Sequence, residues 1–147
     1  MVEALKSIPI FHTLNRKEIR EVEELLYERV YEKDEVVFEE GDAGHGVFIV
    51  VSGRFRVNPS HGSLKSVNLE VGPGESVGEL ALFDEGPRSA TVAAAERTVT
   101  VALFQAEFAT LLQKNKSIGV KVLLEIGRIL SRRARQLLQD EKHAPTL

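Results

Sequence analysis

Hydrophobic residues near the start of the chain recur at a helical period. Within "LNRKEIREVEELLYERV" they occupy Leu14, Ile19, Val22, Leu25, Leu26 and Val30, at spacings of mostly three to five residues. Asn15 precedes this stripe and Glu18 follows it three residues later, which is the pattern of a capping box at a helix start. The spacing therefore predicts a helix that begins after Asn15 and runs to about Val30.

From about residue 31 to 104 the pattern becomes that of short strands. Apolar runs at Val36–Phe38 and Val47–Val51 flank the turn-forming "GDAGHG", and Leu69 and Val71 continue an alternation that starts at Val67. Further on, "SATVAAAERTVTVALF" reads as two strands separated by a turn at Glu96-Arg97. Short strands broken by glycines favour a mainly β fold, a jelly-roll β-barrel, with helices at both ends.

The helical period returns over residues 105–141, and the last helix is predicted over about 117–141. A seam with alternating spacings of three and four residues runs along it: Leu123, Ile126, Leu130, Arg133 and Leu137. The apolar part of this seam can pack on the β core or on a second copy of the chain. No repeat and no linker interrupts the pattern, so we expect residues 1–147 to form a single domain.

Composition narrows the class of protein. The 147 residues carry a net charge of −3, which gives no indication of nucleic-acid binding, and the chain has no cysteine, which removes thiol catalysis and thiolate metal sites. The longest apolar runs fall well short of the roughly 20 residues of a membrane-spanning helix. The N-terminus has an early acid and no long apolar stretch, so we expect no secretory signal and a cytoplasmic location.

One stretch does not fit a purely structural reading. "GELALFDEGPRSATV", residues 78–92, opens like a short helix, breaks at Gly86-Pro87 and resumes as a strand of small residues. It holds one arginine, Arg88, and an acid close to its start, Glu79. This stretch resembles the phosphate-binding cassette of cyclic nucleotide-binding domains, the family that includes the catabolite activator protein and the regulatory subunits of protein kinase A.

Two other passages agree with the resemblance. "IPIFHTLNRKEIREV" is similar to the helical entry of the family, and "DEVVFEEGDAGHGVFIVVSGRFRV" to its first strands and their Gly-Asp turn. The likeness covers about residues 5–140. One departure is Asp34, which stands where family members usually have a glycine.

The resemblance implies a ligand site within the cassette. Arg88 would bind the cyclic phosphate, because a guanidinium stays charged and donates two parallel hydrogen bonds, and the Ser89 hydroxyl and the Ser89 and Ala90 amides would add donors. The short helix formed by Gly78, Glu79 and Leu80 would direct its positive end at the anion, and the Glu79 carboxylate would accept a hydrogen bond from the ribose 2′-hydroxyl. The alternative is that Arg88 is a structural residue paired with Glu79 across the turn.

Candidates for contact with the base are Val71 and Arg133, with Arg132 as the fallback. The alternative for Arg133 is a charge at the edge of the seam that reaches solvent or pairs with an acid on a partner helix. Ser89 resembles the residue of the catabolite activator at this position, which favours cAMP over cGMP. Cyclic GMP and cyclic di-GMP remain open.

Other functions find little support in the residues. The four histidines are scattered and include no His-x-His pair, so we expect no metal, no cofactor and no enzymatic activity. Basic residues crowd the last helix at Arg128, Arg132, Arg133 and Arg135, yet no second recognition helix follows them, so direct DNA binding is not expected.

Two hypotheses therefore stand. The first is a cyclic nucleotide sensor whose C-terminal helix moves on binding and signals to a protein effector that the residues do not identify. The second is an interaction or dimerisation module with a degenerate, non-binding cassette, in which the C-terminal helix joins two copies as a homodimer.

Overall fold

The computed structural model describes residues 2–58, 69–84 and 86–140. Within these residues eight strands form two four-stranded antiparallel sheets. The strands are β1 (Tyr27–Tyr31), β2 (Val36–Phe38), β3 (Gly46–Ser52), β4 (Phe55–Asn58), β5 (Leu69–Val71), β6 (Ser76–Val77), β7 (Thr91–Ala94) and β8 (Thr98–Phe104). The helices are α1 (Val2–Lys6), the 3₁₀ helices η1 (Pro9–Phe11) and η2 (Glu79–Leu82), α2 (Arg16–Glu23), α3 (Gln105–Lys114) and α4 (Lys116–Asp140).

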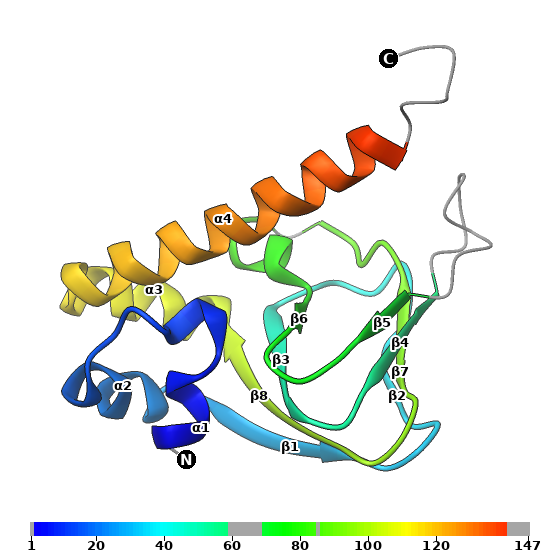
Figure 1. Cartoon of the computed structure of the whole chain (residues 1–147), viewed down its shortest axis with the longest axis horizontal. Helices are drawn as coiled ribbons and strands as arrows, with labels where there is room; N and C mark the ends of the chain where they lie inside the picture. Colours follow the sequence, from blue (N-terminus) through cyan, green and yellow to red (C-terminus); the bar gives the residue numbers. More distant parts are fainter. Residues whose placement is uncertain (1, 59–68, 85, 141–147) are drawn as a thin grey trace.

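The order of strands in the sheets is that of a jelly roll. One sheet runs β1-β8-β3-β6 and the other β2-β7-β4-β5, so strands distant in the sequence become neighbours. Figure 1 shows the two sheets curling around a common interior, with α1, α2 and α3 gathered at one end and α4 lying across the molecule. The sequence prediction of a jelly-roll barrel with flanking helices is confirmed.

Strand β3 separates two hydrophobic cores. Val47 and Ile49 face the helices, whereas Phe48 and Val50 face the interior between the two sheets. This alternation follows from the two-residue period of a strand, and it buries β3 on both faces. The core that contains Val47 and Ile49, here called the helical core, also holds residues of β8 and of all four α-helices. It therefore joins the N-terminal helices to α4.

The first helix is shorter than the sequence pattern predicts. The capping box is confirmed, since the Glu18 amide donates to Asn15 Oδ1 at 2.9 Å and the Asn15 amide donates to Glu18 Oε1 at 3.0 Å. The helix nevertheless ends at Glu23, and Val30 belongs to β1. Strand β1 pairs with β8 along its whole length, so pairing with a distant segment prevails over the local helical period. The β core consequently begins at Tyr27 and not at residue 31.

The predicted strands at 36–38, 47–51 and on either side of Glu96-Arg97 are confirmed, as is the helix over the C-terminal part of the chain. Val67 and residue 141 lie outside the described residues. Asp34, the residue in place of a glycine, has a φ of 70°, in the left-handed region that favours glycine. No helix among the described residues is long and apolar enough to cross a membrane.

The first part of the predicted seam of α4 faces its own domain, whereas Leu137 of the same seam is 45% exposed. Ile126 is completely buried, and Leu123 and Leu130 pack against the helical core. The apolar side chains that α4 leaves exposed include Val120 and Leu124, which lie on a neighbouring face of the helix.

Candidate functional site

Arg88 lies in the extended turn that leads into β7, and its side chain is drawn into the barrel. The residue is 9% exposed, and its Nη2 donates to the Gly46 carbonyl of β3 at 2.8 Å. The guanidinium carbon lies 4.0 Å from the centre of the Phe38 ring and 5.9 Å from that of Phe48, which makes two cation–π contacts. These contacts hold the charge over an aromatic platform inside the fold.

The Arg88 guanidinium has hydrogen-bonding capacity left over. Its Nε is buried and has no hydrogen-bond partner among the described residues, where no carboxylate forms an ion pair with it either. Burial lowers the pKa of Arg88, while the charges of Glu79 and Asp42 act in the opposite direction. Because buried donors in folded proteins are nearly always satisfied, this donor is available to a partner outside the described residues.

Two glycines make room for this side chain. A Cβ at Gly78 would lie 2.1 Å from Arg88 Nη1, and Gly78 has a φ of +84°, which L side chains rarely adopt. A Cβ at Gly44 would lie 2.9 Å from Arg88 Nε. The backbone therefore approaches the guanidinium closely from both sides, and only glycine permits this.

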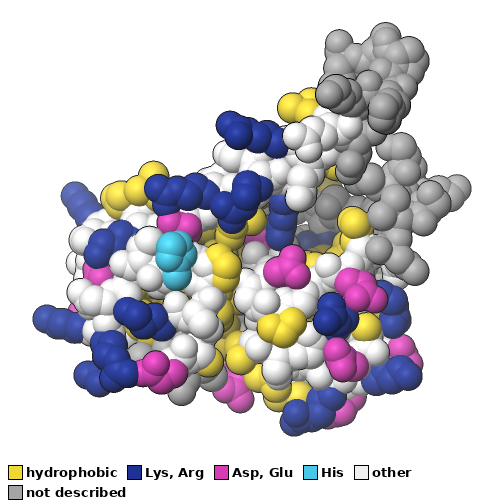
Figure 2. Space-filling model, in the orientation of Figure 1, with side chains coloured by type: hydrophobic (Ala, Val, Ile, Leu, Met, Phe, Trp, Pro, Cys, Tyr) yellow, Lys and Arg dark blue, Asp and Glu magenta, His cyan; other side chains and the backbone are white. Residues whose placement is uncertain are grey.

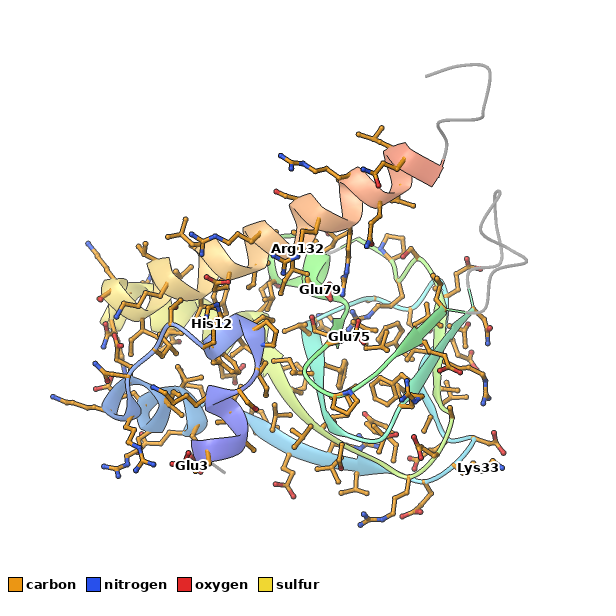
Figure 3. All side chains as sticks on the ribbon, viewed as in Figure 1. Glu3, His12, Lys33, Glu75, Glu79 and Arg132 are labelled. Atoms are coloured by element: carbon orange, nitrogen blue, oxygen red, sulfur yellow. The ribbon has the colours of Figure 1, made fainter. Side chains whose placement is uncertain are left out.

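Glu79 begins η2, directly after Gly78, and its side chain is 2% exposed. Its Oε1 accepts a hydrogen bond from the Ser76 hydroxyl at 3.1 Å. Its Oε2 forms an ion pair with Arg133 Nη1 of α4, and Arg133 Nη2 donates to the Ser76 carbonyl at 2.8 Å. Figure 3 shows Glu79 between the barrel and the middle of α4, next to the turn that carries Arg132.

The remaining cassette residues surround this pair. Ser89 is exposed, Ala90 is buried, and no hydrogen bond from either backbone amide is found within the described residues. Leu80 is exposed on η2. Val71 is buried at the end of β5, in the core between the sheets.

The structure thus brings Arg88, Glu79 and Arg133 to one end of the barrel, although they come from a turn, a 3₁₀ helix and the long C-terminal helix. Among the described residues Glu79 pairs with Arg133, and no direct ion pair between Arg88 and Glu79 is found there. Burial lowers the pKa of Arg88, but the charge of Glu79 nevertheless acts on Arg88 in the opposite direction. Arg132, the fallback for Arg133, is exposed.

Sequence reasoning missed several residues of this site. Phe38 and Phe48 were visible only as strand residues, and Gly44 only as part of a turn. Nothing in the sequence pattern distinguished Ser76 from other residues near a short strand. All four act by touching Arg88 or Glu79, and none is adjacent to Arg88 in the sequence.

A metal centre finds no support in the described part of the chain. No group of three or more histidine, aspartate and glutamate side chains there could hold a metal ion. The arrangement of the site is instead suited to an anion with a hydroxyl group nearby. Within the described residues it offers a buried cation whose Nε has no hydrogen-bond partner, backbone amides without a hydrogen bond and a buried carboxylate.

Comparison with known proteins gives a consistent result. The family model of the cyclic nucleotide-binding domain matches residues 28–115. The chain is 32% identical over 133 residues to the cyclic AMP receptor protein of Thermus thermophilus, covering 90% of this chain and 60% of that protein. It is 30% identical over 140 residues to the cAMP-dependent protein kinase regulatory subunit of Mycosarcoma maydis, covering 95% of this chain and 26% of the relative.

Among solved structures, the catabolite activator protein of Thermus thermophilus superposes with a TM-score of 0.80 at 31% identity, over 91% of this chain and 62% of that one. The chain therefore spans less than two thirds of the length of these relatives. The match extends from β1 to the end of α3 and includes the whole cassette. On these grounds the chain belongs to the cyclic nucleotide-binding domain family.

Proposed function

We propose that this protein is a regulatory, non-enzymatic sensor that binds a cyclic nucleotide in the cytoplasm, with cAMP as the favoured ligand. The observation that carries the proposal is the buried Arg88 guanidinium, whose Nε has no partner among the described residues. A cyclic phosphate carries a single negative charge and would pair with this positively charged group. Charge-assisted hydrogen bonds from a guanidinium to a phosphate are among the stronger polar contacts in proteins.

The phosphate would lie against the turn after Arg88. The Ser89 hydroxyl and the amides of Ser89 and Ala90 would donate to its oxygens. The backbone amides of Glu79 and Leu80 are the first two of η2 and follow Gly78, which has a left-handed conformation. The 3₁₀ helix does not use these amides in its internal hydrogen bonds, so they would add donors for the phosphate. In this reading, the aromatic platform of Phe38 and Phe48 keeps the guanidinium in position.

The Glu79 carboxylate would accept a hydrogen bond from the ribose 2′-hydroxyl. Val71 faces the interior between the sheets and is the candidate for apolar contact with the ligand. The name of the Thermus relative refers to cyclic AMP, and Ser89 favours the same nucleotide, so we place cAMP before cGMP and cyclic di-GMP.

Output would pass through α4 to a protein effector. The whole chain, residues 1–147, is proposed to act as one domain, because the helical core joins α1 and α2 to α3 and α4. A ligand that prefers one position of α4 shifts the population toward that position. The proposal includes neither a membrane contact nor direct contact with DNA.

A second candidate function is an interaction module that assembles through α4 without binding nucleotide. The apolar side chains exposed on α4 favour it: Val120, Leu124, Leu137 and Leu138. Two copies could bury these residues as a homodimer. Figure 2 shows that basic side chains gather along the visible face of the same helix, which would then form the edge of such an interface.

Calorimetric titration separates the two candidates. The protein, freed of co-purified nucleotide, is titrated with cAMP, cGMP and cyclic di-GMP, alongside the Arg88→Ala variant. Binding by the wild type and a loss of affinity of at least about 100-fold in a folded Arg88→Ala variant is the expected result, since the variant loses two hydrogen bonds from a charged donor. Flat titrations with all three nucleotides, together with sedimentation as a dimer, would favour the interaction module.

A further inference from the structure

The contact between Arg133 and Glu79 raises a question about access to the site. Glu79 is the carboxylate proposed to receive the ribose 2′-hydroxyl, yet its side chain is only 2% exposed. Arg133, which forms an ion pair with it, is 41% exposed. The arginine therefore lies on the outer side of the carboxylate and separates it from solvent.

Both oxygens of the carboxylate are already in use. Ser76 donates to Oε1, and Arg133 pairs with Oε2. Arg133 is also held by the Ser76 carbonyl, which accepts from Nη2 at 2.8 Å. Because Arg133 pairs with a carboxylate that is only 2% exposed, movement of Arg133 would open this carboxylate to a hydroxyl group from outside.

Arg133 also holds a particular part of α4. The first half of the helix is attached elsewhere, through Lys121 to Glu18 at 2.9 Å and through Glu125 to His12 at 3.2 Å. Among the described residues of α4, Arg133 is the last with a hydrogen bond or ion pair to the rest of the domain. Loss of this contact would release the part of α4 that follows Leu130 and leave in place the part that packs against the helical core.

We propose that Arg133 and the ribose 2′-hydroxyl compete for the Glu79 carboxylate. Arg133 is then an internal latch that holds the C-terminal half of α4 on the cassette until a ribonucleotide displaces it. The inference rests on the proposed function, and it names the group of the ligand that drives the helix. A cyclic nucleotide without the 2′-hydroxyl can still bind through its phosphate, but it leaves the latch closed.

The test compares cAMP with 2′-deoxy-cAMP by calorimetry, in the wild type, in Arg133→Gln and in Arg132→Gln. Arg132→Gln is the matched control, since it removes the same charge from the adjacent, exposed position. Arg133→Gln should raise the preference for cAMP over 2′-deoxy-cAMP by at least about five-fold, the lower end of typical coupling between sites. Arg132→Gln should leave that preference unchanged.

Equal weakening of both ligands by Arg133→Gln would overturn the latch, because Arg133 would then contact the nucleotide itself. An unchanged preference would overturn it as well. Should Arg133→Gln fail to fold, Arg133→Lys keeps the charge but loses the bidentate contact, and should shift the preference less in the same direction. A wild type that binds no cyclic nucleotide would overturn the proposed function, and the competition with it.

A second measurement needs no nucleotide. Hydrogen exchange of the backbone amides in residues 130–136 should be faster in Glu79→Gln and Arg133→Gln than in the wild type, and unchanged in Arg132→Gln. Exchange at the wild-type rate in both latch variants would overturn the proposal, even if the protein binds cAMP.

Discussion

Arg133 of α4 and Glu79 of η2, 54 positions apart in the sequence, form an ion pair in which the carboxylate is buried and the guanidinium remains partly in solvent. The two members are therefore not equivalent. Without Arg133, a buried negative charge loses its ion-pair partner, whereas without the charge of Glu79 the arginine can turn to water.

This asymmetry predicts unequal effects on stability. Arg133→Met should lower the free energy of unfolding by about 3 kcal/mol, as is typical when a buried charge is left unpaired. Glu79→Gln should lower it by only about 1 kcal/mol, since the amide still forms hydrogen bonds. Urea unfolding of the nucleotide-free protein measures both values, with Arg132→Met as the control. Equal losses of unfolding free energy in the two variants would show that the burial of Glu79 does not make the two partners unequal.

Because the backbone at Gly44 lies close to Arg88, we predict that Gly44→Ala lowers the affinity for the ligand more than it lowers the free energy of unfolding. The new Cβ would lie 2.9 Å from Arg88 Nε, so the guanidinium must shift away from its position over Phe38. We expect cAMP affinity to fall by about ten-fold, which corresponds to roughly 1.4 kcal/mol. Gly72→Ala is the control, because its nearest contact, at 3.4 Å, is with Arg54. An unchanged affinity in Gly44→Ala would argue against Arg88 as the phosphate ligand.

Acid should weaken the contact between the first helices and α4. The hydrogen bond from the Asn15 backbone is the largest influence on Glu18 and lowers its pKa, and Lys121 lowers it further against the effect of burial. A depressed folded-state pKa stabilises the fold above the unfolded value of about 4.5, and this contribution is lost as pH falls through the folded pKa. Glu18→Gln should therefore destabilise the protein at pH 7 but hardly at all at a pH below both pKa values.

Denaturant unfolding at the two pH values measures this difference. Glu24→Gln, at the exposed end of the same helix, serves as the control and should change stability by less than about 0.5 kcal/mol at either pH. A Glu18→Gln effect that persists undiminished in acid would mean that the charge of Glu18 is not what stabilises this contact.

The two glycines of α4 should respond oppositely to alanine. Gly127 is exposed, and a Cβ there would meet nothing within 4 Å, so Gly127→Ala should stabilise the helix by up to about 1 kcal/mol. At Gly119 the Cβ would lie 2.6 Å from Leu112 Cδ2 and 3.3 Å from the Leu112 Cα, so Gly119→Ala should destabilise by about 1–3 kcal/mol. Thermal unfolding of the two variants provides the measurement. Destabilisation by Gly127→Ala would indicate that this face of α4 is covered by another molecule.

The sequence by itself determined the class of fold and the residues of the cassette. Short apolar runs bounded by turn residues predict β3, β7 and β8, because a strand that is largely buried needs few polar positions. Asn15 and Glu18 predict the start of α2, because capping is a local interaction. Arg88, Ser89 and Glu79 stand out because their types and spacing resemble a known cassette.

Tertiary structure decided what local pattern could not. Leu25, Leu26 and Val30 fit a helical period, but β8 offers Val30 a strand partner, so the helix stops at Glu23. The platform of Phe38 and Phe48 under Arg88, and the ion pair between Glu79 and Arg133, join segments that no short-range pattern links. Residue types and periods are properties of neighbours along the chain, whereas the partner of a buried charge depends on which distant elements the fold packs against it.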